Sequence, residues 1–473
     1  MLPEAVTPAI DAVAPVTRRF AAAGHRLYLV GGIVRDLLAG RPVRRQDLDL
    51  TTDAEPTVVK ELVTPVASSL WTQGERFGTI GCIVEGQDLE ITTHRADRYD
   101  GATRKPTVEF SDDVVADLSR RDFTINAIAI EVTTGSPRLI DPFDGAGDLA
   151  AGVLRTPIDP VVSFSDDPLR MLRAARFIAG FGLEPVEELT AAVTDMGARM
   201  SIVSRERVRD ELVKLLSLGD PTAGLEFLRD TGLLRVVLPD VAATALLDDR
   251  GGCHPDALAH TVTLVASTED RTARLAALLA DPASLAPGVT RDDDGLGRRL
   301  RSLRFSNDTT SSVLTAVRSQ RALDLALDER SDPSLRRLVA SAGSDVTTAI
   351  ELVRAEAVAR RAVDSGAVDS GAVDGRAVDG GALRDRVGDL SERLAELSRT
   401  EDLQELGPTV DGAAVMARLA IRPGPEVGAA LAYLSERRIE SGPRDAADEL
   451  DDVASWWSQR ERSTADRSGP DVP

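Results

Sequence analysis

Residues 27–36 are Leu27-Tyr28-Leu29-Val30-Gly31-Gly32-Ile33-Val34-Arg35-Asp36, and Asp47-Leu48-Asp49 follows a short distance along the chain. The apolar run 27–30 predicts a strand, the glycine pair predicts a tight turn, and the segment from Ile33 to Ala39 predicts a helix. A turn that leads into a helix N-terminus presents backbone N–H groups and the positive end of the helix dipole, which attract phosphate. The stretch therefore predicts a site for a phosphorylated ligand.

Asp47 and Asp49 alternate with leucines, as expected for a strand with one buried face. Alternate side chains of a strand share a face, so the two carboxylates would point the same way while Leu48 and Leu50 pack behind them. Two neighbouring carboxylates repel each other unless a cation lies between them, and oxygen ligands beside a triphosphate suit Mg²⁺. Either pattern alone is common in turns and solvated loops. Together they indicate metal-assisted phosphoryl or nucleotidyl transfer.

Two further blocks follow in the chain: Arg120-Arg121-Asp122-Phe123-Thr124-Ile125-Asn126-Ala127 and Ser165-Asp166-Asp167-Pro168-Leu169-Arg170-Met171-Leu172-Arg173-Ala174-Ala175-Arg176-Phe177. With the first block, and in this order, they resemble the class II CCA-adding enzymes, which are tRNA nucleotidyltransferases of the DNA polymerase β superfamily, and the related bacterial poly(A) polymerases. The resemblance is strong over the first half and returns weakly at Asp411-Gly412 and in residues 421–428.

The resemblance implies roles for the residues of the first block and for one acid beyond it. Asp47 and Asp49 would be catalytic and would bind Mg²⁺. Gly32 and Arg35 would contact the triphosphate, because glycine permits close backbone approach and the guanidinium fork suits phosphate oxygens. Glu90 is a candidate third catalytic acid, although it could equally be an exposed charge on a strand.

In the second block, the resemblance places Arg121 on the nucleotide phosphates. Asn126 would contact the sugar or orient a catalytic side chain. Asp122 has a plainer interpretation, because an aspartate at this position can cap the helix that follows.

In the third block, Asp167 and Arg170 are spaced to share one face of a predicted helix, with Arg173 and Arg176 continuing the stripe. The plain interpretation is an intrahelical salt bridge. The resemblance implies instead a nucleotide-binding template that accepts ATP and CTP, because a carboxylate and a guanidinium match the amine and ring nitrogen of adenine and cytosine. Guanine and uracil present a carbonyl where the amine would be, which a carboxylate repels.

Relatives of this type often carry an HD domain, named after an adjacent His-Asp metal pair. Ala259-His260-Thr261-Val262 resembles its first histidine segment, but Leu278-Leu279-Ala280-Asp281 has alanine where the second histidine belongs. The chain has only four histidines, and none follows His260. We therefore expect a helical shell without its metal cluster, in which His254 and His260 are ordinary helix residues.

Composition limits the class of protein. The net charge of −21 argues against a protein that coats nucleic acid electrostatically, so RNA would bind to local arginine clusters. No signal peptide and no apolar run of about 18 residues is visible, which predicts no membrane span. The two cysteines, Cys82 and Cys253, show no metal-binding spacing. These features favour a cytoplasmic protein that has neither a membrane nor DNA as a partner.

The hydrophobic pattern predicts an α+β chain, in which a small mixed sheet with helices is followed by an all-α C-terminal half. We predict a nucleotidyltransferase head with the catalytic acids at 1–155 and a helical neck for base and RNA binding at 156–240. A degenerate HD-like body follows at 241–361, a low-complexity repeat at 362–383, a tRNA-binding helical tail at 384–460 and a disordered end at 461–473.

The resulting prediction is a cytoplasmic, Mg²⁺-dependent enzyme that adds CCA to the 3′ end of tRNA from CTP and ATP without a template. A bacterial poly(A) polymerase acting on other RNA 3′ ends has the same motifs and remains an alternative. A catalytically inactive RNA-binding paralogue is a third possibility, which the intact acids at 47 and 49 and the acidic net charge oppose. A phosphohydrolase built on the HD shell is opposed by Ala280.

Overall fold

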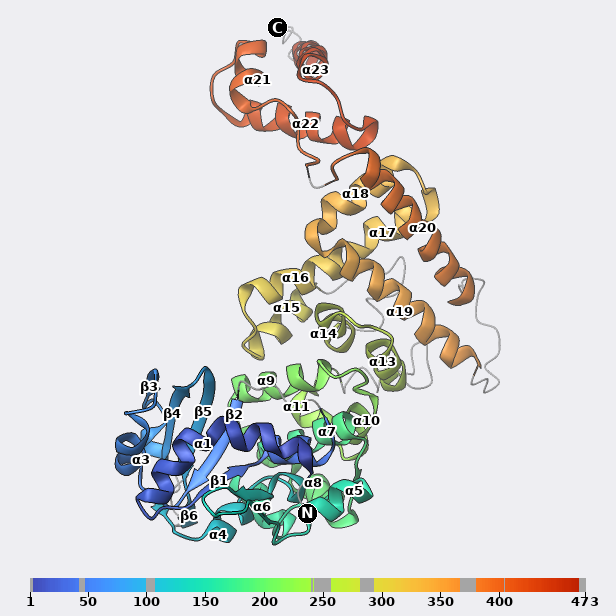
Figure 1. Ribbon diagram of the computed structural model, residues 1–473. Coiled ribbons are helices and arrows are strands. Elements are labelled where there is room, and N and C mark those ends of the chain that lie inside the picture. The colour runs from blue at the N-terminus through green and yellow to red at the C-terminus, as the bar shows by residue number, and fades with distance from the viewer. Residues whose placement is uncertain are drawn as a thin grey trace, which may run out of the picture. The chain divides into compact units, whose positions relative to one another are not determined.

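The computed structural model describes residues 3–41, 47–98, 107–239, 241, 257–280, 293–365, 380–403 and 405–467. By their contacts the residues form two units, Met1–Val237 and Leu238–Pro473. The first unit holds a mixed sheet and helices, and the second has helices as the only regular elements among its described residues (Figure 1). The α+β fold predicted from the sequence is confirmed, whereas the domain boundaries within each unit stay predictions.

The first unit is built on a seven-stranded sheet with the order β3-β4-β5-β2-β1-β8-β9. Its strands are β1 (Leu27–Val30), β2 (Asp47–Thr52), β3 (Ser69–Trp71), β4 (Thr79–Val84), β5 (Gln87–Thr93), β8 (Ala129–Glu131) and β9 (Arg138–Ile140). Strands β2 and β5 are parallel, and every other neighbouring pair is antiparallel. Short two-stranded pairings join β6 (Arg95–Arg98) to β7 (Thr107–Phe110) and β10 (Val153–Leu154) to β11 (Glu184–Pro185).

The strand pairs β4–β5 and β8–β9 form hairpins. Strands β4 and β5 are joined by Glu85 and Gly86, whose φ angles are 50° and 77°. Positive φ at both central residues is typical of a tight hairpin turn. Strands β8 and β9 form the second hairpin.

The first unit also contains α-helices. They are α1 (Thr7–Ala22), α2 (Gly32–Leu38), α3 (Pro56–Val63), α4 (Val114–Ser119), α5 (Gly145–Ala151), α6 (Pro160–Asp166), α7 (Leu169–Phe181), α8 (Glu187–Met196), α9 (Arg205–Leu216), α10 (Thr222–Asp230) and α11 (Leu233–Val237). The helix predicted from Ile33 to Ala39 corresponds to α2.

One face of the sheet is buried in the main core of the first unit. Alternate residues of β2, β4 and β5 face this core, among them Leu50, Ile80 and Ile91, each at most 1% exposed. They pack with Val16 and Phe20 of α1, which crosses this face of the sheet (Figure 1). The alternation places the intervening residues of β2, β4 and β5 on the opposite face.

The second unit has eleven described helices. They are α13 (Ala257–Ala266), α14 (Arg271–Leu279), α15 (Asp293–Ser302), α16 (Asn307–Arg318), α17 (Gln320–Glu329), α18 (Asp332–Ala342), α19 (Val346–Ser365), α20 (Gly380–Thr400), α21 (Gly412–Leu419), α22 (Pro425–Ser441) and α23 (Ala446–Arg467). None of the helices in the described parts of the chain is long and apolar enough to cross a membrane.

The predicted repeat at 362–383 overlaps two of these helices. Helix α19 continues to Ser365 and α20 begins at Gly380, so both ends of the repeat are helical, and residues 366–379 lie outside the described part. Val387 and Leu390 of α20 are buried against Ile350 and Val353 of α19. The end predicted to be disordered also begins within a helix, since α23 reaches Arg467.

Candidate active site

The turn between β1 and α2 lies against two of the predicted site residues. Gly31 has φ 78° and ψ −134°, a conformation that side-chain-bearing residues rarely adopt. A Cβ atom on Gly31 would lie 2.9 Å from Nη1 of Arg121 and 3.9 Å from Oδ2 of Asp49. A Cβ atom on Gly32 would lie 3.5 Å from Nη2 of Arg35. The predicted phosphate turn, an acid of β2 and Arg121 therefore meet at one place.

The acids lie on the face of the sheet opposite the main core. Asp49 of β2 is in register with Glu90 of β5, and both side chains are exposed. Asp47 is in register with Asp88 and lies two positions before Asp49 on the same strand, although its side chain lies outside the described part. Neighbouring strands are about 4.8 Å apart, so the structure brings Asp49 and the predicted third acid, Glu90, together.

The donor set at this point fits a hard cation. Carboxylate oxygens on adjacent strands are the ligands that Mg²⁺ prefers. Among the described side chains no group of three or more histidine, cysteine, aspartate or glutamate residues is placed to hold a metal, and the side chain of Asp47 is not among those described. A complete site at this position would therefore need Asp47 as well as Asp49 and Glu90.

Asp122 is the centre of a buried polar network next to the turn. One carboxylate oxygen accepts a hydrogen bond from Nε of Arg173 at 2.9 Å, and the other accepts from Nδ2 of Asn126 at 2.9 Å. The amide oxygen of Asn126 accepts from Nη1 of Arg35 at 2.7 Å. Asp122 does not cap the helix that follows, because the N-cap position of that short helix, Thr124–Asn126, belongs to Phe123. The capping interpretation is therefore wrong.

Burial and neighbouring charges shift the pKa values of Asp122 and Arg35 in opposite directions. Burial alone would raise the pKa of Asp122, but Arg173, Asn126 and the nearby Arg170 outweigh it and hold the pKa below its usual range. Burial lowers the pKa of Arg35, and its ion pair with Asp36, with an N···O distance of 2.8 Å, acts against that effect. Both groups are therefore held in their charged forms by specific partners.

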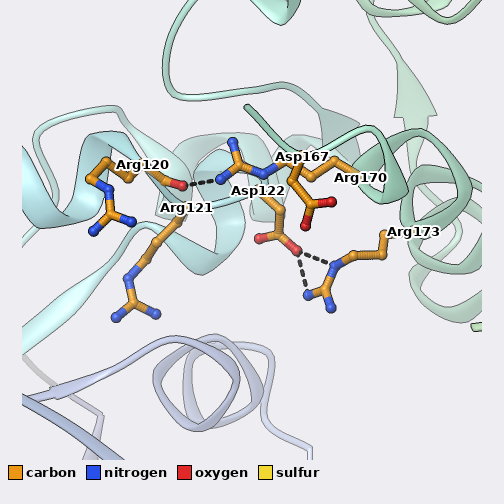
Figure 2. A pocket seen from close by; sticks show the side chains of 6 residues that line it. All are labelled: Arg120, Arg121, Asp122, Asp167, Arg170 and Arg173. Carbon is orange, nitrogen blue, oxygen red and sulfur yellow. Dashed lines mark hydrogen bonds and ion pairs between the residues drawn. The ribbon is translucent and has the colours of Figure 1, made fainter. Parts of the chain in front are cut away.

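A pocket opens beside this network. It is lined by Arg120, Arg121, Asp122, Asp167, Arg170 and Arg173. Figure 2 shows Asp122 between two groups of side chains, with Arg120 and Arg121 on one side and Asp167, Arg170 and Arg173 on the other. Four guanidinium groups and two carboxylates thus surround one space, which suits a ligand that carries phosphate and polar base edges.

The predicted sharing of a helix face by Asp167 and Arg170 is wrong. Asp167 is extended, with φ −142° and ψ 99°, and α7 begins only at Leu169. The cause is Pro168, since a residue that precedes proline disfavours the helical conformation. The carboxylate of Asp167 instead pairs with Arg207 of α9, with an Nη2···Oδ2 distance of 2.8 Å. Asp167 and Arg170 still line the same pocket.

The arginine stripe of α7 separates into different environments. Arg170 donates to the hydroxyl of Ser163 at 2.7 Å and also to the backbone carbonyl of Arg120. Arg173 pairs with Asp122. Arg176 pairs with the buried Glu211 of α9 and is not among the residues that line the pocket. The structure therefore brings Arg170 and Arg173 to the site but assigns Arg176 to the contact between α7 and α9.

Sequence reasoning missed the supporting residues Asp117 and Arg207. Asp117 holds Arg121 in an ion pair of 3.3 Å, and Arg207 holds Asp167. Asp117 precedes Arg121 by one helical turn, so its spacing was a usable signal. Arg207 lies 40 positions from Asp167 and could not be found by local spacing.

Comparison with known proteins agrees with this arrangement. Residues 27–155 match the poly A polymerase head domain, and residues 181–244 match the probable RNA and SrmB-binding site of polymerase A. The CCA-adding enzyme of Lactiplantibacillus plantarum is 32% identical over 317 residues, which are 66% of this chain and 71% of that enzyme. This chain belongs to the class II CCA-adding enzyme and poly(A) polymerase family.

Other relatives match a shorter region. The CCA-adding enzyme of Lactobacillus johnsonii is 38% identical over 235 residues, which are 49% of this chain and 55% of that enzyme. The match to this family member thus spans about half of its length. Nucleotidyl transfer by CCA-adding enzymes depends on a metal ion.

Solved structures of family members share the fold. The Bacillus stearothermophilus CCA-adding enzyme in complex with CTP gives a TM-score of 0.67 at 23% identity, covering 98% of this chain and all of that one (100%). The Thermotoga maritima CCA-adding enzyme complexed with tRNA gives 0.60 at 20% identity, covering 93% and 94%. At these identities the likeness concerns the fold alone.

The family's head-domain match contains most of the predicted site residues but not those of the third block, 165–177. Asp167, Arg170 and Arg173 fall between the two matched regions. Their assignment to the site therefore depends on the pocket geometry described above.

The predicted degenerate HD shell lies in the second unit. His260 of α13 is 1% exposed, and its Nε2 lies 2.9 Å from Oε2 of the buried Glu356 of α19. Ala280 directly follows α14, while Asp281 and His254 lie outside the described residues. His260 thus has a structural partner in the packing of α13 against α19.

Proposed function

We propose that this protein adds C, C and A in turn to the 3′ end of tRNA, using CTP and ATP and releasing pyrophosphate. The observation that carries the proposal is the meeting of Asp49 and Glu90 with the Gly31 turn and Arg121. Nucleotidyl transfer needs carboxylates for a metal next to groups that bind phosphate. Relatives named CCA-adding enzymes, at identities from 32% to 40%, support tRNA as the acceptor.

The proposed metal is Mg²⁺, with Asp47 and Asp49 as its ligands and Glu90 as the third acid. Mg²⁺ held there would polarise the α-phosphate and lower the pKa of the attacking 3′-hydroxyl. The support is the chemistry of the side chains, since Asp47, Asp49 and Glu90 offer carboxylate oxygens, which Mg²⁺ prefers as ligands.

The phosphates of the incoming nucleotide are assigned to the turn and to Arg121. The backbone at Gly32 allows a close approach, and the Arg121 guanidinium lies against the same turn. Arg35 and Asn126 are assigned to positioning, because both are engaged in the network that fixes Asp122 and Arg173.

Base selection is assigned to the pocket formed by Asp167, Arg170 and Arg173. A carboxylate accepts from the exocyclic amine of adenine or cytosine, and a guanidinium donates to the adjacent ring nitrogen. The Arg207 ion pair fixes the Asp167 carboxylate at the pocket wall. The four arginines that line the pocket could also contact phosphate, so the base and the phosphates of one nucleotide would be recognised in the same pocket.

Poly(A) addition is the second candidate, because the matched family model is described as a poly A polymerase head domain. The residues at the chemistry would be the same in both reactions. We further assign RNA contacts to the neck (156–240) and the tail (384–460), and residues 241–361 to the HD-like body. We propose that the reaction takes place in the cytoplasm, where tRNA is found.

Incubation of the protein with a tRNA that lacks its 3′ CCA, with each nucleoside triphosphate alone, tests the proposal. CTP alone is expected to add C and C and then stop, and GTP and UTP are expected to add nothing. Unlimited addition of A from ATP alone would favour poly(A) synthesis. The absence of any incorporation would reject nucleotidyl transfer.

The third acid gives a separate prediction. Glu90→Gln keeps the shape of the side chain but removes its charge, and we expect kcat to fall by about a hundredfold while the KM for CTP changes little. Glu85→Gln is the matched control, because Glu85 lies in the hairpin turn that joins β4 to β5. Equal kcat values for Glu90→Gln and the wild type would show that Glu90 is an exposed charge on the strand and not a catalytic acid.

Nucleotide selectivity tests the assignment of Asp167. Asp167→Ala is expected to reduce the preference for CTP over UTP, measured as the ratio of kcat/KM values, by about tenfold to a hundredfold, because a bidentate base contact is worth about 1–3 kcal/mol. Asp210→Ala is the control, since Asp210 is an exposed acid on α9 whose ion pair is with Arg209. An unchanged preference for CTP over UTP in Asp167→Ala would reject a role of Asp167 in base selection and would leave the ion pair with Arg207 as the only role of its carboxylate.

A further inference from the structure

A tryptophan lies in the same row of the sheet as the acids. The strand registers align Trp71 of β3 with Gly81 of β4, Gly81 with Glu90 of β5, and Glu90 with Asp49 of β2. Residues that are directly opposite one another on paired strands point to the same face. Trp71 is therefore on the face that carries Asp49 and Glu90, and it is partly exposed.

The missing side chain of Gly81 allows the indole to lie across β4. A Cβ atom on Gly81 would come within 2.0 Å of Cε2 and Nε1 of Trp71 and within 2.5 Å of Cζ2. The ring thus covers the strand next to Glu90. With a strand spacing of about 4.8 Å, its position over β4 is about 10 Å from β2 and Asp49.

The position of this ring relative to the phosphate turn indicates which reactant it meets. The turn follows β1, on one side of β2, whereas β5, β4 and β3 lie on the other side. In phosphoryl and nucleotidyl transfer the attacking and leaving oxygens are roughly in line. If the pyrophosphate leaves on the side of the β1 turn, the attacking 3′-hydroxyl must approach over β5 and β4.

We propose that the indole of Trp71 is the surface on which the terminal base of the RNA acceptor stacks, so that the 3′-hydroxyl is held beside Glu90 and Asp49. This inference depends on the proposed nucleotidyl transfer to RNA. Stacking on an aromatic ring is insensitive to base identity, because every base has a π-face. It therefore suits an acceptor end whose last base changes after each addition.

An acceptor without its last base tests the contact directly. The substrates are a tRNA that ends in CC and the same tRNA with an abasic terminal nucleotide that retains its 3′-hydroxyl. With ATP saturating, the wild type is expected to show a kcat/KM for RNA about tenfold higher for the intact end. In Trp71→Ala the kcat/KM for the intact RNA should fall by about tenfold, so that the two RNAs have equal kcat/KM values. The KM for ATP should stay unchanged. Trp71→Phe, which keeps a ring, should retain most of the difference.

Two outcomes would overturn the inference. In the first, Trp71→Ala lowers kcat/KM by the same factor for both RNAs; in the second, it lowers kcat/KM for neither RNA. Trp71→Leu, which fills space without a ring, replaces Trp71→Ala if the smaller residue prevents folding. Equilibrium binding of the two RNAs to the wild type and to the Trp71 variant needs no turnover. It therefore tests the stacking contact even if the wild type adds no nucleotide, which would reject the proposed function separately.

Discussion

Asp49→Ala is expected to abolish nucleotide addition, with kcat reduced at least about a thousandfold for CTP and ATP alike. Metal-assisted catalysis supplies several kcal/mol of transition-state stabilisation, and each 1.36 kcal/mol corresponds to about tenfold in rate. The effect should be equal for every addition step, because the acid serves the chemistry and not the choice of base. Single-turnover incorporation of CMP and AMP measures it.

The matched control is Asp112→Ala, an exposed acid that precedes α4. It should add nucleotides at the wild-type rate, and Asp49→Ala should still bind tRNA with nearly wild-type affinity. Asp47→Ala should behave like Asp49→Ala. Substantial turnover by the Asp47→Ala, Asp49→Ala double variant would contradict the metal assignment.

Asp122→Ala is expected to cause the largest loss of stability, about 3–5 kcal/mol in the free energy of unfolding. Removal of the buried Asp122 carboxylate leaves the partly buried guanidinium of Arg173 without its ion-pair partner and the buried Asn126 without an acceptor. Denaturant unfolding monitored in the first unit measures the loss. Asp122→Asn combined with Arg173→Met removes both charges and should recover part of it.

The exposed pair Arg229 and Asp230 supplies the control, because Asp230→Ala should change the free energy of unfolding little. A loss of similar size in Asp122→Ala and Asp230→Ala would show that the buried network contributes no more than a surface ion pair.

The lowered pKa of Asp122 also predicts a pH dependence. A carboxylate whose pKa is lower in the folded state stabilises the fold fully above its unfolded pKa, which is about 3.9. This stabilisation is lost as the pH falls through the lower, folded value. The difference in unfolding free energy between wild type and Asp122→Asn should therefore be constant near neutral pH and shrink only in acid below about pH 4.

Local patterns in the sequence predicted the parts of the fold that local physics determines. The apolar run 27–30, the glycine pair and the alternation around Asp47 and Asp49 produced β1, the turn and β2 as expected. The residues of the turn and its acids meet because β1 and β2 are hydrogen-bonded neighbours. A short-range pattern was sufficient for this part of the candidate site.

Contacts between distant segments could not be predicted in this way. Asp122 and Arg173 are 51 positions apart, and their ion pair exists only because α7 packs beside the second block. The helical spacing predicted for Asp167 and Arg170 is wrong because Pro168 excludes Asp167 from the helix. The row from Trp71 to Asp49 depends on strand register, which a single sequence does not specify.

The central claim is tested most directly by sequencing the RNA 3′ ends that the protein makes from a tRNA lacking CCA when all four nucleoside triphosphates and Mg²⁺ are present. The products should end in CCA and grow no further during long incubation. An open-ended run of A would contradict CCA addition while leaving nucleotidyl transfer intact, and unchanged tRNA would contradict both.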